Sequence, residues 1–271
     1  MSIASKLVEF FSGNRVGQDF CERLTRKTGE LMGIGSGEDV RNSGEKAVIE
    51  KMAEILSPPY CVFDVGANTG QFLNLVISKL GSAGYRIHCF EPSPQAFATL
   101  SRNTSGIASS SLVLNPIGLG REAGEVMLYF NEPGSQIASL TKRRLGHLGI
   151  DFSKSQPIRI DTLEHYCEIN NIPTIDLLKV DVEGHELDVL QGGGRRLFEK
   201  GAVKMVSFEF GGCNIDTRTF FQDYFYFFKD AHMNLFRITP SGYLYPIFRY
   251  REILEQFRTT NFLAIHESLT V

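Results

Sequence analysis

The stretch Cys61-Val-Phe-Asp-Val-Gly-Ala-Asn-Thr-Gly-Gln71 decides the fold of this chain. Val62, Phe63 and Val65 form a short β-branched and aromatic run, which is typical of a strand buried on both faces of a parallel sheet. Two glycines interrupt the run, and apolar residues at helical spacing then predict a helix that ends at Gly81. A strand, a glycine turn and a helix N-terminus together form a site for a ligand that needs close backbone approach and amide donors.

Two acidic residues indicate the class of that ligand. Asp64 ends the first predicted strand, where a carboxylate disfavours a phosphate and favours a cationic or hydroxyl-bearing ligand. Glu91 ends the next predicted strand and can accept hydrogen bonds from both hydroxyls of a ribose. S-adenosylmethionine fits, because its ammonium pairs with a carboxylate and its carboxylate with helix amides. The residues that we expect to bind it here are Asp64, Gly66, Asn68, Thr69, Gly70, Glu91 and Pro92.

A third predicted strand extends this site. Residues 111–115 form an apolar run, and the segment 116–118 turns away from its end. Asn115 and Ile117 are therefore expected to flank the adenine of the same cofactor.

Composition and charge limit the kind of protein. The chain has 271 residues, 42% hydrophobic and 22% charged, as expected for one large globular domain or a domain with a small appendage. A net charge of −3 gives no general reason to bind nucleic acid or an anionic membrane. The five cysteines show no Cys-x-x-Cys spacing, and no apolar run is long enough to span a bilayer. We expect a cytoplasmic protein with buried thiols that acts on a small-molecule or glycan substrate, without nucleic acid and without an integral membrane segment. The oligomeric state is left open.

Two regions stand apart from the predicted sheet. Residues 1–58 are expected to form a helical appendage to a main domain at 59–271. Within the main domain, residues 121–160 are expected to form a hairpin-like insertion with a long loop. That loop contains a basic run that is either a solvated face or a site for an anionic part of the substrate. Its members are Lys142, Arg143, Arg144 and His147.

Acidic residues recur where predicted strands end. In an open parallel α/β sheet, ligands bind at the carboxyl ends of the strands. Asp181 and Glu209 follow two further apolar runs, as Asp64 and Glu91 follow the first two. Helix capping explains any one of these acids, but it is less convincing for all four. Asp181 and Glu209, with Glu183 nearby, are therefore expected to face the reacting end of the ligand.

Three segments resemble the FkbM family of methyltransferases. They are Phe63-Asp-Val-Gly-Ala-Asn-Thr-Gly-Gln71, Phe90-Glu-Pro92, and Leu178-Lys-Val-Asp-Val-Glu-Gly-His-Glu186 followed by Leu190-Gln-Gly-Gly193. The agreement runs in the right order from about residue 44 to 266. The resemblance implies an α/β class I S-adenosylmethionine-dependent fold, a Rossmann-like sheet of seven strands with the last antiparallel. It also implies O-methylation of a hydroxyl on a sugar, a glycan or glycolipid, or a secondary metabolite.

Methyl transfer needs a positioned hydroxyl oxygen and a group that removes its proton. In-line positioning supplies much of the rate, and a carboxylate or histidine base adds roughly 10²–10⁴-fold. Asp181, Glu183 and His185 are candidate bases, with Glu209 in support, and Asp181 is also expected beside the cofactor. A divalent cation held by Asp181 and Glu209 is an alternative that is possible but not favoured.

Two other functions are weighed against this one. A nicotinamide-dependent oxidoreductase on a related fold is disfavoured, because Gly-x-Gly-x-x-Gly is absent and Asp64 would face a pyrophosphate. A binding scaffold without turnover is disfavoured, because the acids at the later strand ends remain.

Overall fold

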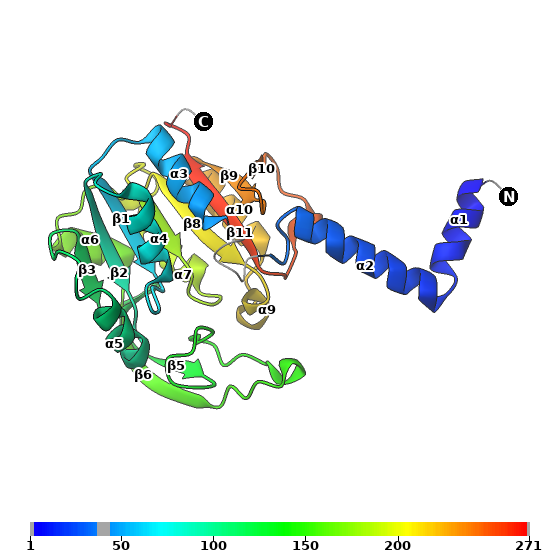
Figure 1. The fold of residues 1–271 in the computed structure, drawn as a ribbon, viewed down its shortest axis with the longest axis horizontal. Helices are drawn as coiled ribbons and strands as arrows, with labels where there is room; N and C mark the ends of the chain where they lie inside the picture. The colour runs from blue at the N-terminus through cyan, green and yellow to red at the C-terminus, as the bar shows by residue number, and fades with distance from the viewer. Residues whose placement is uncertain (1–2, 37–43, 270–271) are drawn as a thin grey trace.

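The computed structural model describes residues 3–36 and 44–269. Its main sheet has eight strands in the order β10-β9-β11-β8-β7-β1-β2-β3 (Figure 1). They are β1 (Tyr60–Val65), β2 (Tyr85–Phe90), β3 (Leu112–Asn115), β7 (Leu177–Val180), β8 (Met205–Phe210), β9 (Met233–Ile238), β10 (Leu244–Pro246) and β11 (Thr260–His266). Strands β3, β2, β1, β7 and β8 are parallel, whereas β11 is antiparallel to both of its neighbours.

This strand order confirms the predicted Rossmann-like class I sheet. The last strand, β11, lies between β8 and β9 and runs against both, as the resemblance implies. The short strand β10 pairs antiparallel with β9 and adds an eighth strand at the edge. The sheet therefore has one strand more than the seven that were expected.

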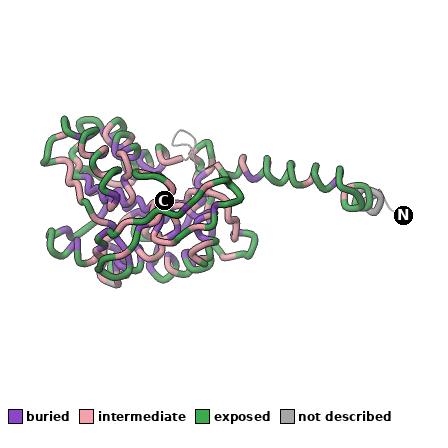
Figure 2. Tube along the Cα trace, turned by 90° about the horizontal axis from the view of Figure 1, so that it is seen from below, coloured by how far each residue is buried: buried purple, intermediate pink, exposed green. Residues whose placement is uncertain are grey.

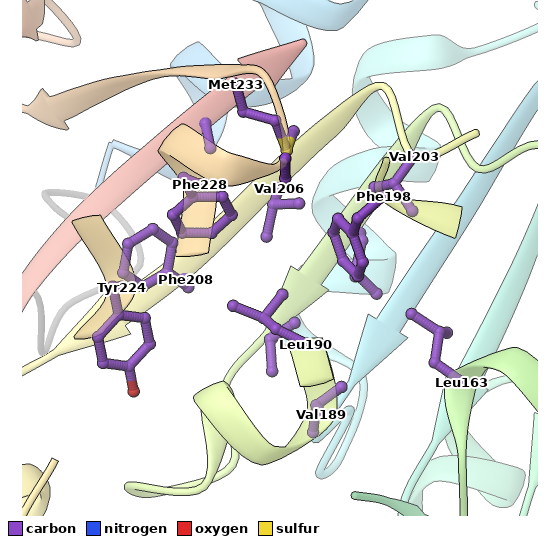
Figure 3. Close-up of a cluster of buried hydrophobic side chains, with 14 of the residues drawn as sticks. Leu163, Val189, Leu190, Phe198, Val203, Val206, Phe208, Tyr224, Phe228 and Met233 are labelled. Carbon is purple, nitrogen blue, oxygen red and sulfur yellow. The ribbon is translucent and has the colours of Figure 1, made fainter. Parts of the chain in front are cut away.

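Two buried clusters cover the two faces of the sheet. Because successive side chains of a strand point to opposite faces, Val62 packs in one cluster while Phe63 and Val65 pack in the other. One face is covered by α3 (Glu45–Ile55), α4 (Gln71–Leu80) and α5 (Pro94–Asn103). The opposite face is covered by α6 (Leu163–Ile169), α7 (Glu186–Gln191), α8 (Gly194–Leu197) and α10 (Phe221–Asp230). Figure 3 shows this second cluster, in which Phe208 of β8 stacks on Tyr224 of α10 with ring centroids 5.0 Å apart.

The N-terminal helices behave differently from one another. Helix α3 contributes the fully buried Val48, Ile49 and Met52 to the core, so it packs as part of the main body. Helices α1 (Ile3–Ser12) and α2 (Arg15–Leu31) project from the body, and α2 is exposed along most of its length (Figures 1 and 2). The division of the chain at residue 58 stays a prediction. Within residues 3–36 and 44–269, no helix combines the length and hydrophobicity needed to cross a bilayer.

The segment after β3 forms a second, smaller sheet. Its three strands have the order β4-β6-β5, namely β4 (Gly118–Leu119), β5 (Gly124–Phe130) and β6 (Lys154–Asp161). Strands β5 and β6 pair antiparallel, in the region where a hairpin-like insertion was expected. The loop between them, residues 131–153, includes the short helix η1 (Gly146–Leu148) and reaches back to the main sheet.

Candidate active site

A cavity of about 980 Å³ opens at the carboxyl ends of the central strands. Its wall includes residues that follow β1, β2 and β7, one residue near the end of β8, and residues of the 131–153 loop. Ligand sites in proteins measure roughly 300–1,000 Å³. The cavity is therefore large enough for a cofactor and part of an acceptor, and it lies where ligands of parallel α/β sheets bind.

The glycine turn after β1 is held directly against the end of β7. Gly66 has a φ of +86°, and a Cβ atom on it would lie 1.8 Å from the carbonyl oxygen of Asp181. The amide of Asp181 in turn donates a hydrogen bond of 3.0 Å to the carbonyl of Val65. Only glycine fits at this position, both for its conformation and for its space. The contact fixes the two halves of the cavity relative to each other.

Glu91 is fixed at the cavity wall by backbone donors. Its Oε2 accepts from the amide of Asn68 at 2.9 Å, and its Oε1 accepts from the amide of Ser93 at 2.8 Å. The residue is 6% exposed and lines the cavity with Pro92. Burial raises the pKa of Glu91 to about 7, although both amide donors favour the carboxylate. Each carboxylate oxygen keeps a further lone pair, so Glu91 can still accept two ligand hydroxyls.

Asp64 lies behind the wall of the cavity and not on it. Its side chain is fully buried, does not line the cavity, and has Lys179 as its ion-pair partner at 3.6 Å. The same ammonium lies 3.2 Å from Asp181 and 3.9 Å from Glu45. Although burial disfavours the charge of Lys179, these three carboxylates raise its pKa. Lys179 thus gives Asp64 an ion-pair partner within the protein, and the contact of Asp64 with a ligand ammonium stays a prediction.

Other expected cofactor contacts also have partners of their own. Asn115 donates to the carbonyl of Cys89 and accepts from the Tyr166 hydroxyl, and neither Asn115 nor Ile117 lines the cavity. Gly118 and Leu119, which follow them, form that part of the wall. Thr69 and Gly70 lie outside the cavity wall as well. The Thr69 carbonyl accepts from Asn103, and Gly70, with a φ of +95°, is the residue before α4.

Asn68 and the start of α4 do reach the cavity. Asn68 adopts a left-handed φ of 45°, which asparagine tolerates better than most residues, and its side-chain Oδ1 is buried without a hydrogen-bond partner. Gln71 and Phe72, the first residues of α4, line the cavity next to it. Asn68 and the first residues of α4 thus line the same cavity.

Three acids gather at the opposite side. Asp181, Glu183 and Glu209 all line the cavity, as the sequence predicted for the ends of these strands. Burial, reinforced by the charge of Asp181, raises the pKa of Glu183 to about 8, although Arg143 opposes the shift. Burial and the neighbouring acids Asp181 and Glu183 also raise the pKa of Glu209 well above its ordinary value. Of the Asp181 side chain 41% is exposed, against 21% of the Glu183 side chain.

The turn between β7 and α7 is braced by a buried acid that the prediction did not include. Glu186 is 1% exposed and accepts hydrogen bonds from the amides of Val182 and Gly184 at 3.1 and 3.0 Å. The Tyr224 hydroxyl donates to its other oxygen at 3.3 Å. Between the two amides, Glu183 is held at a φ of +56°, in the left-handed region that glycine favours. Glu186 therefore has a structural role, and it presents Glu183 to the cavity.

His185 stands between two side-chain partners. Its Nδ1 lies 2.8 Å from Asp188 Oδ2, and its Nε2 lies 3.0 Å from the Thr141 hydroxyl. The hydrogen bond to His185 holds the pKa of the Asp188 carboxyl below its ordinary value. His185 lines the cavity, so it remains among the candidate bases.

An extended part of the insertion loop binds the turn that carries Glu183. We call residues 139–144 the strap. Ser139 donates to the carbonyl of Glu183 at 2.8 Å, and Arg143 Nη1 lies 2.7 Å from Glu183 Oε2. Arg143 Nε lies 3.7 Å from Asp216, whose Oδ1 accepts from the amide of Arg144 at 3.3 Å. Alternate residues of the strap thus meet the turn between β7 and α7, as expected for an extended segment.

The members of the predicted basic run have different surroundings in the structure. Arg143 is only 11% exposed and lies within 4 Å of both Glu183 and Asp216, so its guanidinium is engaged within the protein. Arg144 and His147 are exposed and line the cavity, whereas Lys142 is exposed and does not line it. Arg144 and His147 therefore remain candidates for contact with an anionic acceptor, and Lys142 does not.

No metal centre is evident in the part of the chain that the structure describes. Within residues 3–36 and 44–269, no group of three or more His, Cys, Asp or Glu side chains is arranged to hold an ion. A cation held by Asp181 and Glu209 alone would lack the further protein ligands that such sites commonly have.

Sequence reasoning missed Lys179, Thr141, Asp188 and Asp216, which all lie at or beside the site. The role of Lys179 could have been predicted, because it is a cation inside an otherwise apolar strand. The roles of Thr141, Asp188 and Asp216 could not, since their partners are distant in sequence or lie on a neighbouring turn.

Known proteins match this chain over its central part. Residues 64–236, more than half of the chain, match the family described as the Methyltransferase FkbM domain. Hexuronic acid methyltransferase AglP of Haloferax volcanii is 28% identical over 149 residues, which cover 55% of this chain and 56% of that protein. The 31-O-demethyl-FK506 methyltransferase FkbM of Streptomyces tacrolimicus is 29% identical over 160 residues, 51% of this chain and 60% of that protein. The chain thus spans between half and two thirds of these relatives' length.

A solved structure is also similar. The crystal structure of a protein named methyltransferase FkbM from Methylobacillus flagellatus aligns with 91% of this chain and 60% of that chain, at 14% identity and a TM-score of 0.44. The fold assignment rests on the strand order described above, and the family assignment rests on the match over residues 64–236. The chain belongs to the FkbM-domain family of methyltransferases.

Proposed function

We propose that this protein transfers the methyl group of S-adenosylmethionine to a hydroxyl group of a sugar, a glycan or a secondary metabolite. One observation carries the proposal. A single cavity has a ribose-type acceptor, Glu91, on one side and a group of three acids on the other, joined where Gly66 meets Asp181. A cofactor that extends from Glu91 toward Asp181 has its reactive end beside the three acids.

The residues on the cofactor side fit S-adenosylmethionine. Glu91 offers two carboxylate oxygens to the ribose hydroxyls, and Gly66 also lines the cavity. Asn68 lines the cavity, and its Oδ1, which has no hydrogen-bond partner, is the acceptor that suits the ammonium group. The N-terminus of α4 suits the carboxylate of the methionine part. When bound, this cofactor supplies an electrophilic methyl group.

The protein's own task is to position and deprotonate the acceptor. Asp181 is our candidate for the base, because 41% of its side chain is exposed and it lies next to the glycine turn. The raised pKa values of Glu183 and Glu209 favour their protonated forms, which donate hydrogen bonds to acceptor oxygens. His185, held by Asp188 and Thr141, is a second candidate for the base. Proton removal by a carboxylate contributes roughly 10²–10⁴-fold to the rate.

The acceptor class follows from the wall opposite the cofactor. Acids, His185 and the exposed Arg144 and His147 add polar groups to a wall that also contains apolar residues such as Leu145, Leu148 and Ile215. These polar groups suit a hydroxyl-rich acceptor that carries a carboxylate or phosphate. Two relatives are named for hexuronic acid and for a demethylated FK506, so the family includes proteins named for both kinds of acceptor. Exclusion of nucleic acid and a cytoplasmic location remain predictions from charge and composition.

A transfer assay tests the proposal. The purified protein is incubated with S-adenosylmethionine carrying a labelled methyl group and with uronic acids, neutral sugars or polyhydroxylated macrolides in parallel. We expect label in at least one hydroxyl of one acceptor class, and none when Asp181→Asn replaces the native chain. Binding of the cofactor without transfer to any class would favour a non-catalytic scaffold.

A further inference from the structure

Helix α2 carries an apolar stripe that nothing in the described chain covers along its middle. Val16 is 79% exposed, Phe20 and Leu24 are each 53% exposed, and Leu31 is 79% exposed. Their spacing of four, four and seven residues places them on one face of the helix. Scattered exposed apolar residues are ordinary on proteins, but a stripe along a projecting helix marks an interaction surface.

The start of α2 packs on α1, and the segment past its end contacts the body. At its start, the Asn14 side chain accepts from the amide of Gly17 at 2.9 Å, and the rings of Phe11 and Phe20 stack with centroids 5.5 Å apart. Past its end, the amide of Gly35 donates to the carbonyl of Thr259 at 2.9 Å. The helix is therefore joined to the body at its C-terminal end, and most of its residues are exposed (Figure 2).

The charges of α2 are divided unevenly between its halves. Residues 15–22 contain Arg15, Asp19 and Glu22, one cation and two anions, which gives −1. Residues 23–31 contain three cations and one anion, which gives +2; these are Arg23, Arg26, Lys27 and Glu30. Two such helices side by side attract when they are antiparallel, because each half then faces the opposite sign. In a parallel pair, each half faces its own sign and repels.

We propose that α2 pairs antiparallel with α2 of a second copy of this chain, with the two apolar stripes in contact. A pair of this kind is isologous, so each copy buries the same surface. Only the C-terminal end of α2 joins the body, so antiparallel pairing places the two bodies at opposite ends of the helix pair. A helix of 17 residues is about 26 Å long, which keeps the bodies apart.

A membrane surface is the other occupant that an amphipathic helix suggests. Helices that lie in a membrane interface carry mainly Lys and Arg on the polar face. In α2 the anions Asp19, Glu22 and Glu30 are interleaved with the cations, and the net charge of the helix is only +1. The charge pattern of α2 thus favours a second copy of this chain over a membrane surface.

The first test is the mass of the full chain in solution, measured by light scattering after size-exclusion chromatography over a range of concentrations. We expect a dimer, and we expect Phe20→Glu with Leu24→Glu to weaken dimerisation by at least tenfold. Ile169→Glu with Ile253→Glu is the matched control, since those side chains are 61% and 69% exposed elsewhere on the body. A monomeric native chain, or a double Phe20 and Leu24 variant that dimerises as tightly as the native chain, overturns the proposal.

The second test addresses orientation. Asp19→Lys with Glu22→Lys makes both halves positive, and dimerisation should weaken by at least tenfold. Adding Arg23→Glu and Arg26→Glu exchanges the signs of the halves, so an antiparallel dimer should re-form and a parallel one should not. A fourfold variant that stays as weak as the double variant overturns antiparallel pairing. Native chain that remains monomeric and co-sediments with vesicles containing phosphatidylserine, and not with neutral vesicles, assigns the stripe to a membrane instead.

Discussion

Glu91 and Glu183 are both acids near the ends of parallel strands, but different parts of the chain hold them. Glu91 is bound by the amides of Asn68 and Ser93, both within 23 positions in sequence. Glu183 is bound by the Arg143 side chain from the insertion, 40 positions away. The cofactor half of the cavity is thus formed by local backbone, whereas the acceptor half depends on side chains of a separate element. The acceptor half can therefore change within a family without disturbing the cofactor half.

The junction of the two halves is where a substitution should have the largest effect. Gly66→Ala places a Cβ atom against the Asp181 carbonyl and forces alanine into a left-handed φ. We expect the free energy of unfolding in urea to fall by about 3 kcal/mol or more, from the combined strain and overpacking. Gly106→Ala, where a Cβ atom meets nothing within 4 Å, should change it by less than about 0.5 kcal/mol. Equal stability of the two variants contradicts the close packing of the halves.

The acceptor half should control chemistry without controlling cofactor affinity. Asp181→Asn keeps the shape of the side chain and removes its basicity, so turnover should fall by about 10²-fold or more. Affinity for S-adenosylmethionine should change far less, since Glu91 is untouched, and Asp151→Asn on an exposed loop should leave turnover unchanged. Treatment with a chelator should have no effect; loss and recovery with added divalent ions would instead favour a cation at Asp181 and Glu209.

The burial of Glu183 should make stability fall as the pH rises. Its pKa is raised from the ordinary value of 4.5 to about 8, by burial and then by Asp181, against Arg143 and with Glu186 adding to the shift. The folded state therefore keeps a proton that the unfolded state loses between these values, so this stabilisation is present below pH 4.5 and is lost by pH 8.

The variant Glu183→Gln tests whether Glu183 makes the stability fall as the pH rises. Glutamine resembles the protonated carboxyl, so both chains should be similarly stable at pH 5. From pH 5 to pH 9 the variant should lose less unfolding free energy than the native chain, by on the order of 1–2 kcal/mol. The exposed Glu125→Gln is the control, and its pH profile should follow the native one. Parallel profiles for all three chains would mean that Glu183 is not held protonated in the folded state.

The smallest effect is expected at the outer wall. Arg144→Gln with His147→Gln should raise KM for an anionic acceptor a few-fold, because exposed charges contribute about 1 kcal/mol or less. Lys142→Gln, one residue away but outside the cavity, should leave KM unchanged. If KM is unchanged in the double variant, Arg144 and His147 do not contact the acceptor, and the whole basic run is only a solvated surface.

Prediction from sequence succeeded where contacts are local. The strand, turn and helix around Gly66, and the position of Glu91, follow from neighbouring residues. The type of sheet was expected only from the resemblance to the FkbM family. The pairing of Asp64 with Lys179 was not predicted, because Lys179 lies 115 positions later, on a strand that pairs with that of Asp64 only after folding. The pairing of Arg143 with Glu183 escaped for the same reason. The pattern of a sequence shows which charges exist, and long-range packing decides which of them neutralise one another.

Titration calorimetry tests the central claim most directly. The native chain is titrated with S-adenosylmethionine and, separately, with NAD, and the Glu91→Ala variant is titrated with S-adenosylmethionine. We predict that the native chain binds S-adenosylmethionine and does not bind NAD. Loss of the charged hydrogen bonds of Glu91, worth roughly 1.5–3 kcal/mol, should weaken the affinity of the variant by about tenfold or more. The account is contradicted if the native chain binds no S-adenosylmethionine, or if Glu91→Ala binds it with unchanged affinity.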